Sequence, residues 1–133
     1  MKANWEDFVE ARIVGIEVRH DRQTAKIVTE GLNCRYSSIN LQGVERILVN
    51  EFRETNVIES ATLWAANLSP LTEKLAFLIS NSDDLSRQAD FKEAIEEVKS
   101  KIEAGTLVFF EIEPIYGAWI MALVRDVACL DRT

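Results

Sequence analysis

Two glutamates, Glu111 and Glu113, stand two residues apart in the apolar run FFEIEPIYGAWI. On a β-strand such residues point to the same face and lie roughly 6.5 to 7 Å apart. Two carboxylates at that spacing are able to share general acid–base work, as in glycoside hydrolysis. Catalytic pairs normally come from different strands and sit in a cleft that separates their pKa values. We therefore expect a solvated strand face, with a small hydrolase or ligand-binding domain using the Glu111/Glu113 face as the alternative.

Aromatic residues accompany the two glutamates. Tyr116 lies in the expected turn PIYG and Trp119 lies on the strand expected after it. Rigid rings beside charges resemble the composition of interface hot spots. We expect Trp119 in the core, whereas Tyr116 is either a simple turn residue or a contact residue. Tyr116 therefore joins Glu111 and Glu113 among the predicted partner-binding residues.

Other residues of catalytic or metal-binding type are few and scattered. His20 is the only histidine and lies in the polar stretch RHDRQ, which is typical of a surface turn. Cys34 and Cys129 lack a neighbour at metal-ligand or redox spacing, so both are expected to be reduced, with a long-range disulfide as the alternative. The chain has no phosphate loop, nucleophile elbow or dinucleotide-binding pattern. The sequence predicts no catalytic residue, no metal site and no cofactor.

The elements that position these residues belong to a chain of 133 residues, of which 47% are hydrophobic. This length predicts one domain, residues 1–133, that buries roughly two thirds of its unfolded surface. The longest uncharged apolar stretch, residues 115–124, is about half as long as a bilayer requires. The N-terminal stretch is acidic and has no cleavage pattern, so no secretory signal is expected and the predicted location is the cytoplasm.

A hairpin is expected near the N-terminus, because two segments alternate apolar and polar residues. In ARIVGIEVR the residues Val14, Ile16 and Val18 are predicted to form the buried face. In TAKIVTEG, Ala25 and Ile27 repeat the pattern. The short polar connection HDRQ predicts that the two strands pair.

Further strands follow from composition. NCRYSSINLQGV is a third candidate, and β-branched residues favour two more, at about 44–52 and 56–64. Near the C-terminus, strands are expected at 106–113 and 118–125, with PIYG as the turn between them.

Two helices are predicted between these groups of strands. The first begins at Ser69 and Pro70, with Ser as N-cap and Pro at the first helical position. The second has a capping box of Asp90 and Glu93 and ends at Gly105 in a left-handed conformation. We predict an α+β fold, in which an antiparallel sheet of about five N-terminal and two C-terminal strands is covered on one side by two helices.

Charge is the clearest signal of function. The net charge is −7, with 8 basic against 10 acidic residues up to Ser60 and 7 against 12 beyond it. Such a chain repels phosphate backbones and anionic lipids, so neither a nucleic acid nor a membrane is expected as a partner. A basic protein remains a candidate partner, and plain solubility is the competing explanation of the acidity. The predicted contact residues on the second helix are Glu93, Glu96 and Glu97.

Taken whole, the chain resembles the small acidic α+β immunity proteins encoded beside bacterial toxins, in stretches such as YSSINLQGVERILVNEFRETNVI and EIEPIYGAWI. The resemblance implies a non-enzymatic protein that binds a cognate toxin domain and blocks its active site or an adjoining surface. Many such toxins are basic nucleases, which suits the negative charge. A homo-oligomeric structural subunit is a third hypothesis.

Overall fold

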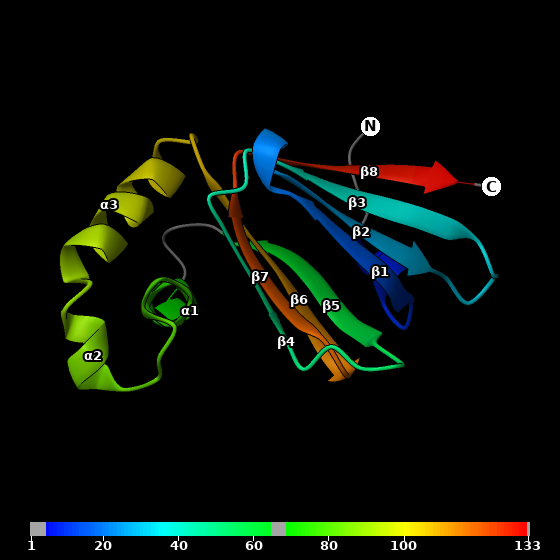
Figure 1. Ribbon diagram of the computed structural model, residues 1–133, viewed down its shortest axis with the longest axis horizontal. Helices are drawn as coiled ribbons and strands as arrows, with labels where there is room; N and C mark the ends of the chain where they lie inside the picture. The colour runs from blue at the N-terminus through cyan, green and yellow to red at the C-terminus, as the bar shows by residue number, and fades with distance from the viewer. Residues whose placement is uncertain (1–4, 65–68, 133) are drawn as a thin grey trace.

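The protein is described by a computed structural model that covers residues 5–64 and 69–132. Within these residues one antiparallel sheet of eight strands is accompanied by three α-helices and two short 3-10 helices (Figure 1). In chain order the elements are η1 (Trp5–Phe8), β1 (Arg12–Arg19), η2 (His20–Arg22), β2 (Thr24–Glu30), β3 (Tyr36–Gln42), β4 (Arg46–Asn50), β5 (Val57–Trp64), α1 (Ser69–Ser80), α2 (Leu85–Ala89), α3 (Lys92–Glu103), β6 (Val108–Tyr116), β7 (Trp119–Val124) and β8 (Asp126–Arg132). The predicted α+β class with an antiparallel sheet is confirmed, and the sheet is larger than predicted because β8 follows β7.

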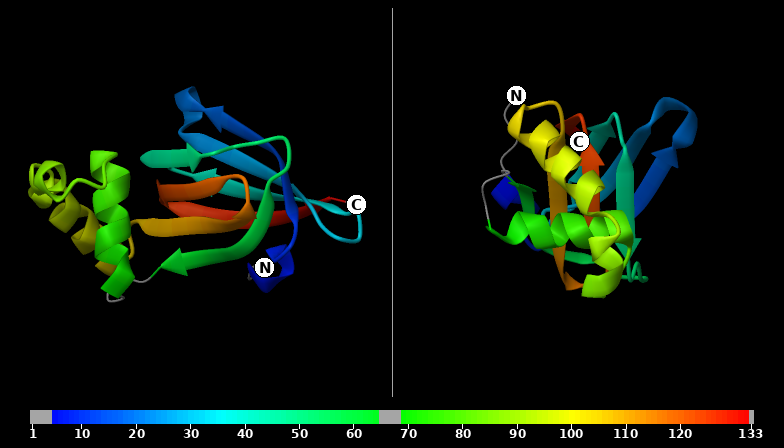
Figure 2. Two further views of the ribbon diagram at one scale, coloured as in Figure 1. Left: turned by 90° about the horizontal axis from the view of Figure 1, so that it is seen from below. Right: turned by 90° about the vertical axis from the view of Figure 1, so that its left-hand side faces the viewer.

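The sheet folds back on itself. Its strand order is β4-β7-β6-β5-β1-β2-β3-β8, yet β4 continues β3 after a bend at Gly43, and β8 continues β7 after Arg125. The β3–β8 ladder therefore runs on into the β4–β7 ladder. Across the bend, Arg125 N donates to Gln42 O and Glu45 N donates to Leu123 O, both at 2.9 Å. The two halves of the sheet enclose a core between them (Figure 2).

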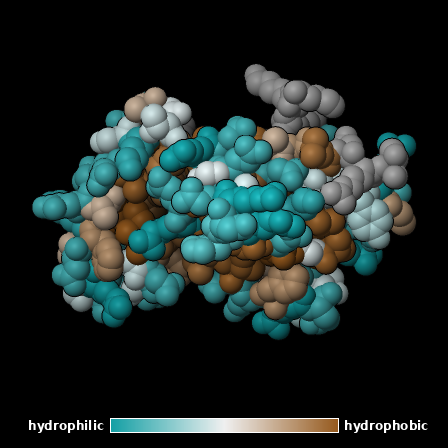
Figure 3. Space-filling model, turned by 45° about the horizontal axis from the view of Figure 1, so that its top comes forward, coloured by the Kyte–Doolittle hydropathy of each residue, from teal (hydrophilic) through white to brown (hydrophobic). Residues whose placement is uncertain are grey.

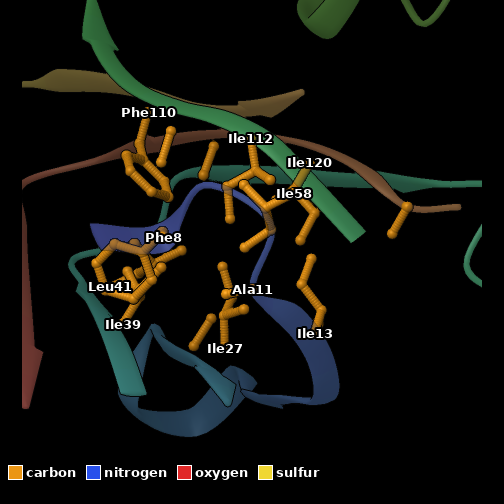
Figure 4. Packing of buried hydrophobic residues seen from close by; sticks show 14 of the residues in the cluster. Phe8, Ala11, Ile13, Ile27, Ile39, Leu41, Ile58, Phe110, Ile112 and Ile120 are labelled. Atoms are coloured by element: carbon orange, nitrogen blue, oxygen red, sulfur yellow. The ribbon is translucent and has the colours of Figure 1, made fainter. Parts of the chain in front are cut away.

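This first core contains the inward-facing residues of both halves. Figure 4 shows apolar side chains from the two halves pointing toward one another, among them Ile27, Ile39, Leu41, Phe110, Ile112 and Ile120. Each of these six is fully buried, and burial of a side chain of this size stabilises the fold by about 1.5 to 3 kcal/mol. The ring of Trp5 in η1 closes over the cluster, with its centroid 5.0 Å from that of Phe110.

A second core joins the helices to the sheet. Strand β6 is buried on both faces, because Phe110 belongs to the first core whereas its neighbour Phe109 packs with Leu75 of α1 and Ile95 of α3. Met121 of β7 lies in the same second cluster. Figures 1 and 2 show the helices gathered at one end of the molecule, beside β4, β6 and β7. Among the described residues, no helix has the length and apolar character needed to span a bilayer.

The first hairpin is confirmed, since β1 pairs with β2 across the exposed η2 turn that contains His20. The buried face predicted for β1 is wrong in part, because Val14 and Val18 are 48% and 54% exposed. A β-bulge between Ile13 and Gly15 shifts the phase of the alternation, so Ile13 is buried instead. Strands β2, β3, β4 and β5 lie within the segments predicted for them.

The helix starts differ from those predicted at two places. The first helix is confirmed as α1, but Ser69 is its first helical residue and not its N-cap. The capping box of Asp90 and Glu93 is wrong because the short helix α2 intervenes. Asp90 is the C-cap of α2, and Phe91 is the N-cap of α3, where its side chain makes no capping bond. The capping carboxylate is that of Asp84, which accepts a 2.9 Å bond from Ser86 N at the start of α2.

The turn after β6 is shorter than predicted. Pro114, Ile115 and Tyr116 belong to β6 itself, and Gly117, at φ +87°, turns the chain into β7. Gly105 after α3 has φ +81°, as the sequence predicted.

Candidate functional site

The two glutamates of β6 have different environments. Glu111 is 1% exposed, whereas the side chain of Glu113 is 42% exposed. The alternation along β6 is as predicted, because Phe110 and Ile112 point into the first core. The expectation that the opposite face is solvated is wrong at Glu111, because α1 and two tryptophans enclose its carboxylate.

Three donors bind the Glu111 carboxylate. The indole Nε1 of Trp64 donates to Oε1 at 2.8 Å, and that of Trp119 donates to Oε2 at 2.7 Å. Lys74 Nζ donates to Oε2 at 3.0 Å. The ammonium also lies 5.1 Å and 5.8 Å from the ring centroids of Trp64 and Trp119, within the range of cation–π attraction. We call these four residues the Glu111 cluster.

The sheet register and α1 bring the cluster together. Glu111 lies beside Thr62 of β5 on one side and Met121 of β7 on the other, which places Trp64 and Trp119 two positions away on the neighbouring strands. The ring of Trp119 stacks on Phe77 of α1, with centroids 6.0 Å apart and planes at 17°. The cluster therefore fixes α1 against β5, β6 and β7.

This geometry does not place the two glutamates for acid–base catalysis. Every oxygen of Glu111 already accepts a hydrogen bond, and the carboxylate has no access to a substrate. Burial, and then the nearby charge of Glu111, raise the pKa of Glu113, while the Lys74 ammonium acts against them. A hollow of about 240 Å³ near the η2 end of the sheet is lined by neither glutamate. Its charged lining includes Glu17 and Arg19, which form an exposed ion pair at 2.8 Å.

Metal ligands do not gather in the part of the chain that the structure describes. Among these residues no group of three or more His, Cys, Asp or Glu side chains is placed to hold a metal ion. Cys34 is exposed and Cys129 is half-buried, and no disulfide joins the two.

The acids of the helical part form an exposed surface. Seven acids and four bases fall within residues 83–103. The acids, all exposed, are Asp83, Asp84, Asp90, Glu93, Glu96, Glu97 and Glu103, and we call them the acidic helical surface. Among the described residues, only Glu97 of this group has a basic nitrogen within 4.0 Å, from Lys101 at 3.5 Å. In Figure 3 hydrophilic side chains at the helical end, on the left, are interspersed with hydrophobic ones. Six of these seven acids therefore have no close ion-pair partner among the described residues, and the segment carries a net charge of −3.

A second exposed surface lies where β6 turns into β7. Phe52, Ile115 and Tyr116 are 51%, 58% and 47% exposed. The guanidinium of Arg53 lies over the ring of Tyr116, 5.5 Å from its centroid. We call these four residues the turn surface.

One buried side chain, that of Asn56, holds the turn surface in place. Its Oδ1 accepts bonds from Arg53 N and Ala118 N, both at 2.9 Å, and its Nδ2 donates to Arg53 O at 2.7 Å. The loop between β4 and β5 is thereby bonded to the turn between β6 and β7.

The six predicted partner-binding residues do not form one surface. Glu93, Glu96 and Glu97 lie on α3, at the helical end, while Tyr116 lies at the far tip of β6 (Figure 1). Glu113 lies between these regions, and Glu111 is buried beneath α1 and out of reach of a partner in this structure. The partner-binding role of the exposed residues stays a prediction.

Several important side chains were not singled out from the sequence. Trp64, Lys74 and Asn56 each form hydrogen bonds with residues distant in the chain. Hydrophobic periodicity and composition do not predict such long-range contacts. The segment RETN before β5 has the composition of a turn, but composition does not show that Asn56 bonds to Ala118.

Comparison with protein-family models, with curated proteins and with solved structures finds no match to this chain. The function is therefore argued from the geometry of the chain itself.

Proposed function

We propose that this chain is a non-enzymatic, acidic protein-binding module of the immunity type, which neutralises a cognate basic toxin domain, such as a nuclease, in the cytoplasm. The observation that carries the proposal is the acidic helical surface, where six of seven exposed carboxylates have no ion-pair partner among the described residues. A cationic partner supplies the missing counter-charge.

The placement of these acids supports this role. In the proposal, α1 and α3 cover one side of the sheet and α3 presents its charged side to solvent. Ile95 of α3 packs into the second core, while Glu93, Glu96 and Glu97 are exposed. A field from several like charges on one face attracts an oppositely charged protein over about a Debye length, roughly 8 to 10 Å at physiological salt.

The state of Glu111 argues against the alternative of a small hydrolase. A general acid or base must reach the reacting atoms, and Glu111 instead accepts bonds from Trp64, Lys74 and Trp119 beneath α1. No observation favours the hydrolase, so the binding module is the function that the geometry supports best.

The test is co-expression with the toxin-like domain encoded beside the gene, scored by rescue of growth and by co-purification. Binding kinetics are then measured with a catalytically inactive form of that domain. Neutralising Glu93, Glu96 and Glu97 to Gln is expected to slow association by on the order of 10-fold at low salt and to leave dissociation nearly unchanged.

A matched control removes the same charge elsewhere. Asp21→Asn/Glu45→Gln/Asp126→Asn changes three acids that are also exposed but belong to the η2 turn and the bend of the sheet. This variant is expected to slow association less. If the toxin-like domain neither binds nor loses toxicity, the proposal is wrong.

A further inference from the structure

We infer that the turn surface, Phe52, Arg53, Ile115 and Tyr116, anchors the basic partner through an apolar side chain that the partner carries among its cationic residues. This inference rests on the proposed function and adds the place of short-range contact.

The exposed side chains of the turn surface have the composition of an anchor. Tyr and Arg are enriched among the residues that dominate binding energy, and rigid aromatic rings lose little conformational freedom on binding. Here Arg53 already lies over the Tyr116 ring, which orders both side chains before a partner arrives. Phe52 and Ile115, each more than half exposed, directly precede Arg53 and Tyr116 in the chain and add exposed apolar area.

The backbone beneath these side chains is also ordered in advance. Asn56 is 2% exposed, and its side chain bonds to the backbone of Arg53 in the β4–β5 loop and of Ala118 in the β6–β7 turn. Its own carbonyl accepts a 2.8 Å bond from Ile13 N, which ties the loop to β1 as well. A surface held in this way loses little entropy when a partner binds.

Charges around the turn surface favour a cationic occupant. Glu51 and Glu54 flank the two loop residues in the chain, and the side chain of Glu51 is 70% exposed. On the β6 side, Glu113 precedes Ile115 by two positions. The negative charge of Glu59 contributes to raising the pKa of Glu113.

Fewer positive charges lie in this region. Arg53 belongs to the turn surface itself. Arg12 lies on β1, two strands from Tyr116, because Tyr116 of β6 pairs with Val57 of β5 and Val57 pairs with Arg12. Lys74 lies 3.9 Å from Glu113, and Arg53 lies 4.0 Å from Glu51. Four acids therefore stand against three bases, and the excess is one negative charge.

This excess selects among occupants. A second copy of the chain would bring the same negative excess to the contact, and nucleic acid or an anionic membrane would be repelled. A basic protein with an exposed apolar residue matches both the charge and the apolar centre. The four residues are too few for a standard interface of about 800 Å² per partner, so they form the anchor of a larger contact.

The turn surface and the acidic helical surface then affect different rate constants. Charges at the helical end act at a distance and raise the association rate, which falls as salt increases. The apolar and aromatic contacts at the tip of β6 form only at contact distance, and they lengthen the lifetime of the complex.

The experiment measures association and dissociation of the inactive toxin-like domain with the Phe52→Ser/Ile115→Ser variant and with Tyr116→Ala. We expect dissociation to become at least about 10-fold faster for each, with an unchanged salt dependence of association. Tyr116→Phe, which keeps the ring, is expected to dissociate within about threefold of the wild-type rate.

Val18→Ser is the matched control. Val18 is 54% exposed, like Phe52, but it lies at the opposite end of β1 from Arg12. Circular dichroism and thermal unfolding of each variant establish that it is folded before its rates are compared.

Each outcome bears on the inference differently. If the domain binds and the turn-surface variants dissociate at the wild-type rate, the inference is overturned and the proposed function stands. If the domain does not bind at all, the proposed function fails and the inference fails with it. If sedimentation shows dimers that Phe52→Ser/Ile115→Ser converts to monomers, the turn surface joins two copies and the inference is overturned.

Discussion

Lys74 Nζ lies 3.0 Å from Oε2 of Glu111 and 3.9 Å from Oε1 of Glu113, so one cation on α1 bridges both glutamates of β6. The side chain of Lys74 is 20% exposed and that of Glu111 is fully buried. The spacing that suggested catalysis in the sequence therefore holds a helix against a sheet.

Breaking the Glu111 cluster is expected to destabilise the fold. In Glu111→Gln the carboxamide nitrogen faces a donor, so at least one of the three donors loses its acceptor, at a cost of about 1 to 3 kcal/mol. Lys74→Met leaves a buried carboxylate without its cation, at a cost of up to about 3 to 5 kcal/mol. Urea unfolding measures both.

The double variant is the control for this assignment. Because Glu111 and Lys74 bind each other directly, Glu111→Gln/Lys74→Met is expected to cost less than the sum of the single changes. Additive costs would show that the two side chains stabilise the fold independently and that the cluster has been misassigned.

The stability difference between Glu113→Gln and the wild type is expected to depend on pH. Burial and Glu111 raise the pKa of Glu113 in the folded protein, with Glu59 acting in the same direction and Lys74 opposing. The folded state thus holds this proton more tightly, so the favourable contribution is present at acid pH and is lost as pH rises through the folded pKa.

Glutamine mimics the protonated form, so Glu113→Gln should match the wild type at acid pH and exceed its stability near pH 7. The gain is expected to be less than about 1 kcal/mol, because solvent screens a side chain that is 42% exposed. Unfolding by urea between about pH 4 and pH 7 checks this. A difference that is constant across this range, or a wild type that is more stable at pH 7, contradicts it.

Removing the Asn56 side chain is expected to loosen the turn surface. Asn56→Ala leaves the buried amide of Ala118 without an acceptor and should cost about 1 to 3 kcal/mol. Hydrogen exchange at the Arg53 and Ala118 amides is expected to speed up. Asn33→Ala is the control, because Asn33 accepts a similar 3.1 Å bond from Arg35 N at an exposed site and should change stability by at most about 0.5 kcal/mol.

Gly117→Ala and Gly105→Ala separate the cost of backbone conformation from the cost of crowding. Both glycines have positive φ, so each alanine costs about 1 to 2 kcal/mol. At Gly105 the new Cβ meets nothing within 4 Å, whereas at Gly117 it collides with the Asn56 amide oxygen and lies 2.6 Å from Thr55 O. Thermal unfolding should therefore show the larger loss for Gly117→Ala, and equal losses would contradict the tight turn.

Much of the secondary structure followed from periodicity, because the positions and types of β1 to β5, α1, α3, β6 and β7 depend on local patterns. The two errors in the predicted strands, the buried face of β1 and the missing β8, also have local causes. The bulge at Ile13 and Gly15 moves the buried face of β1 by one residue, and the bend at Arg125 hides the continuation of β7 into β8. Neither feature changes composition enough to be recognised in advance.

The candidate site was harder to predict than the fold. Alternation correctly put Glu111 and Glu113 on one face, but which element covers that face is a tertiary property. The lysine and two indoles that bind Glu111 come from 37 and 47 residues before it and 8 residues after it, so no window of sequence contains the whole cluster. Conversely, the exposure of Glu93, Glu96 and Glu97 followed from helical period alone.

The continuation of β7 into β8 gives the chain unequal resistance to mechanical force. Tension applied beyond β8 would unzip that strand from its single neighbour, β3, one pair at a time. At Arg125 the opening would halt, since β7 is held by β4 on one edge and by β6 on the other. A chain pulled from this side would therefore yield first at low load and then resist until the sheet ruptures as a whole.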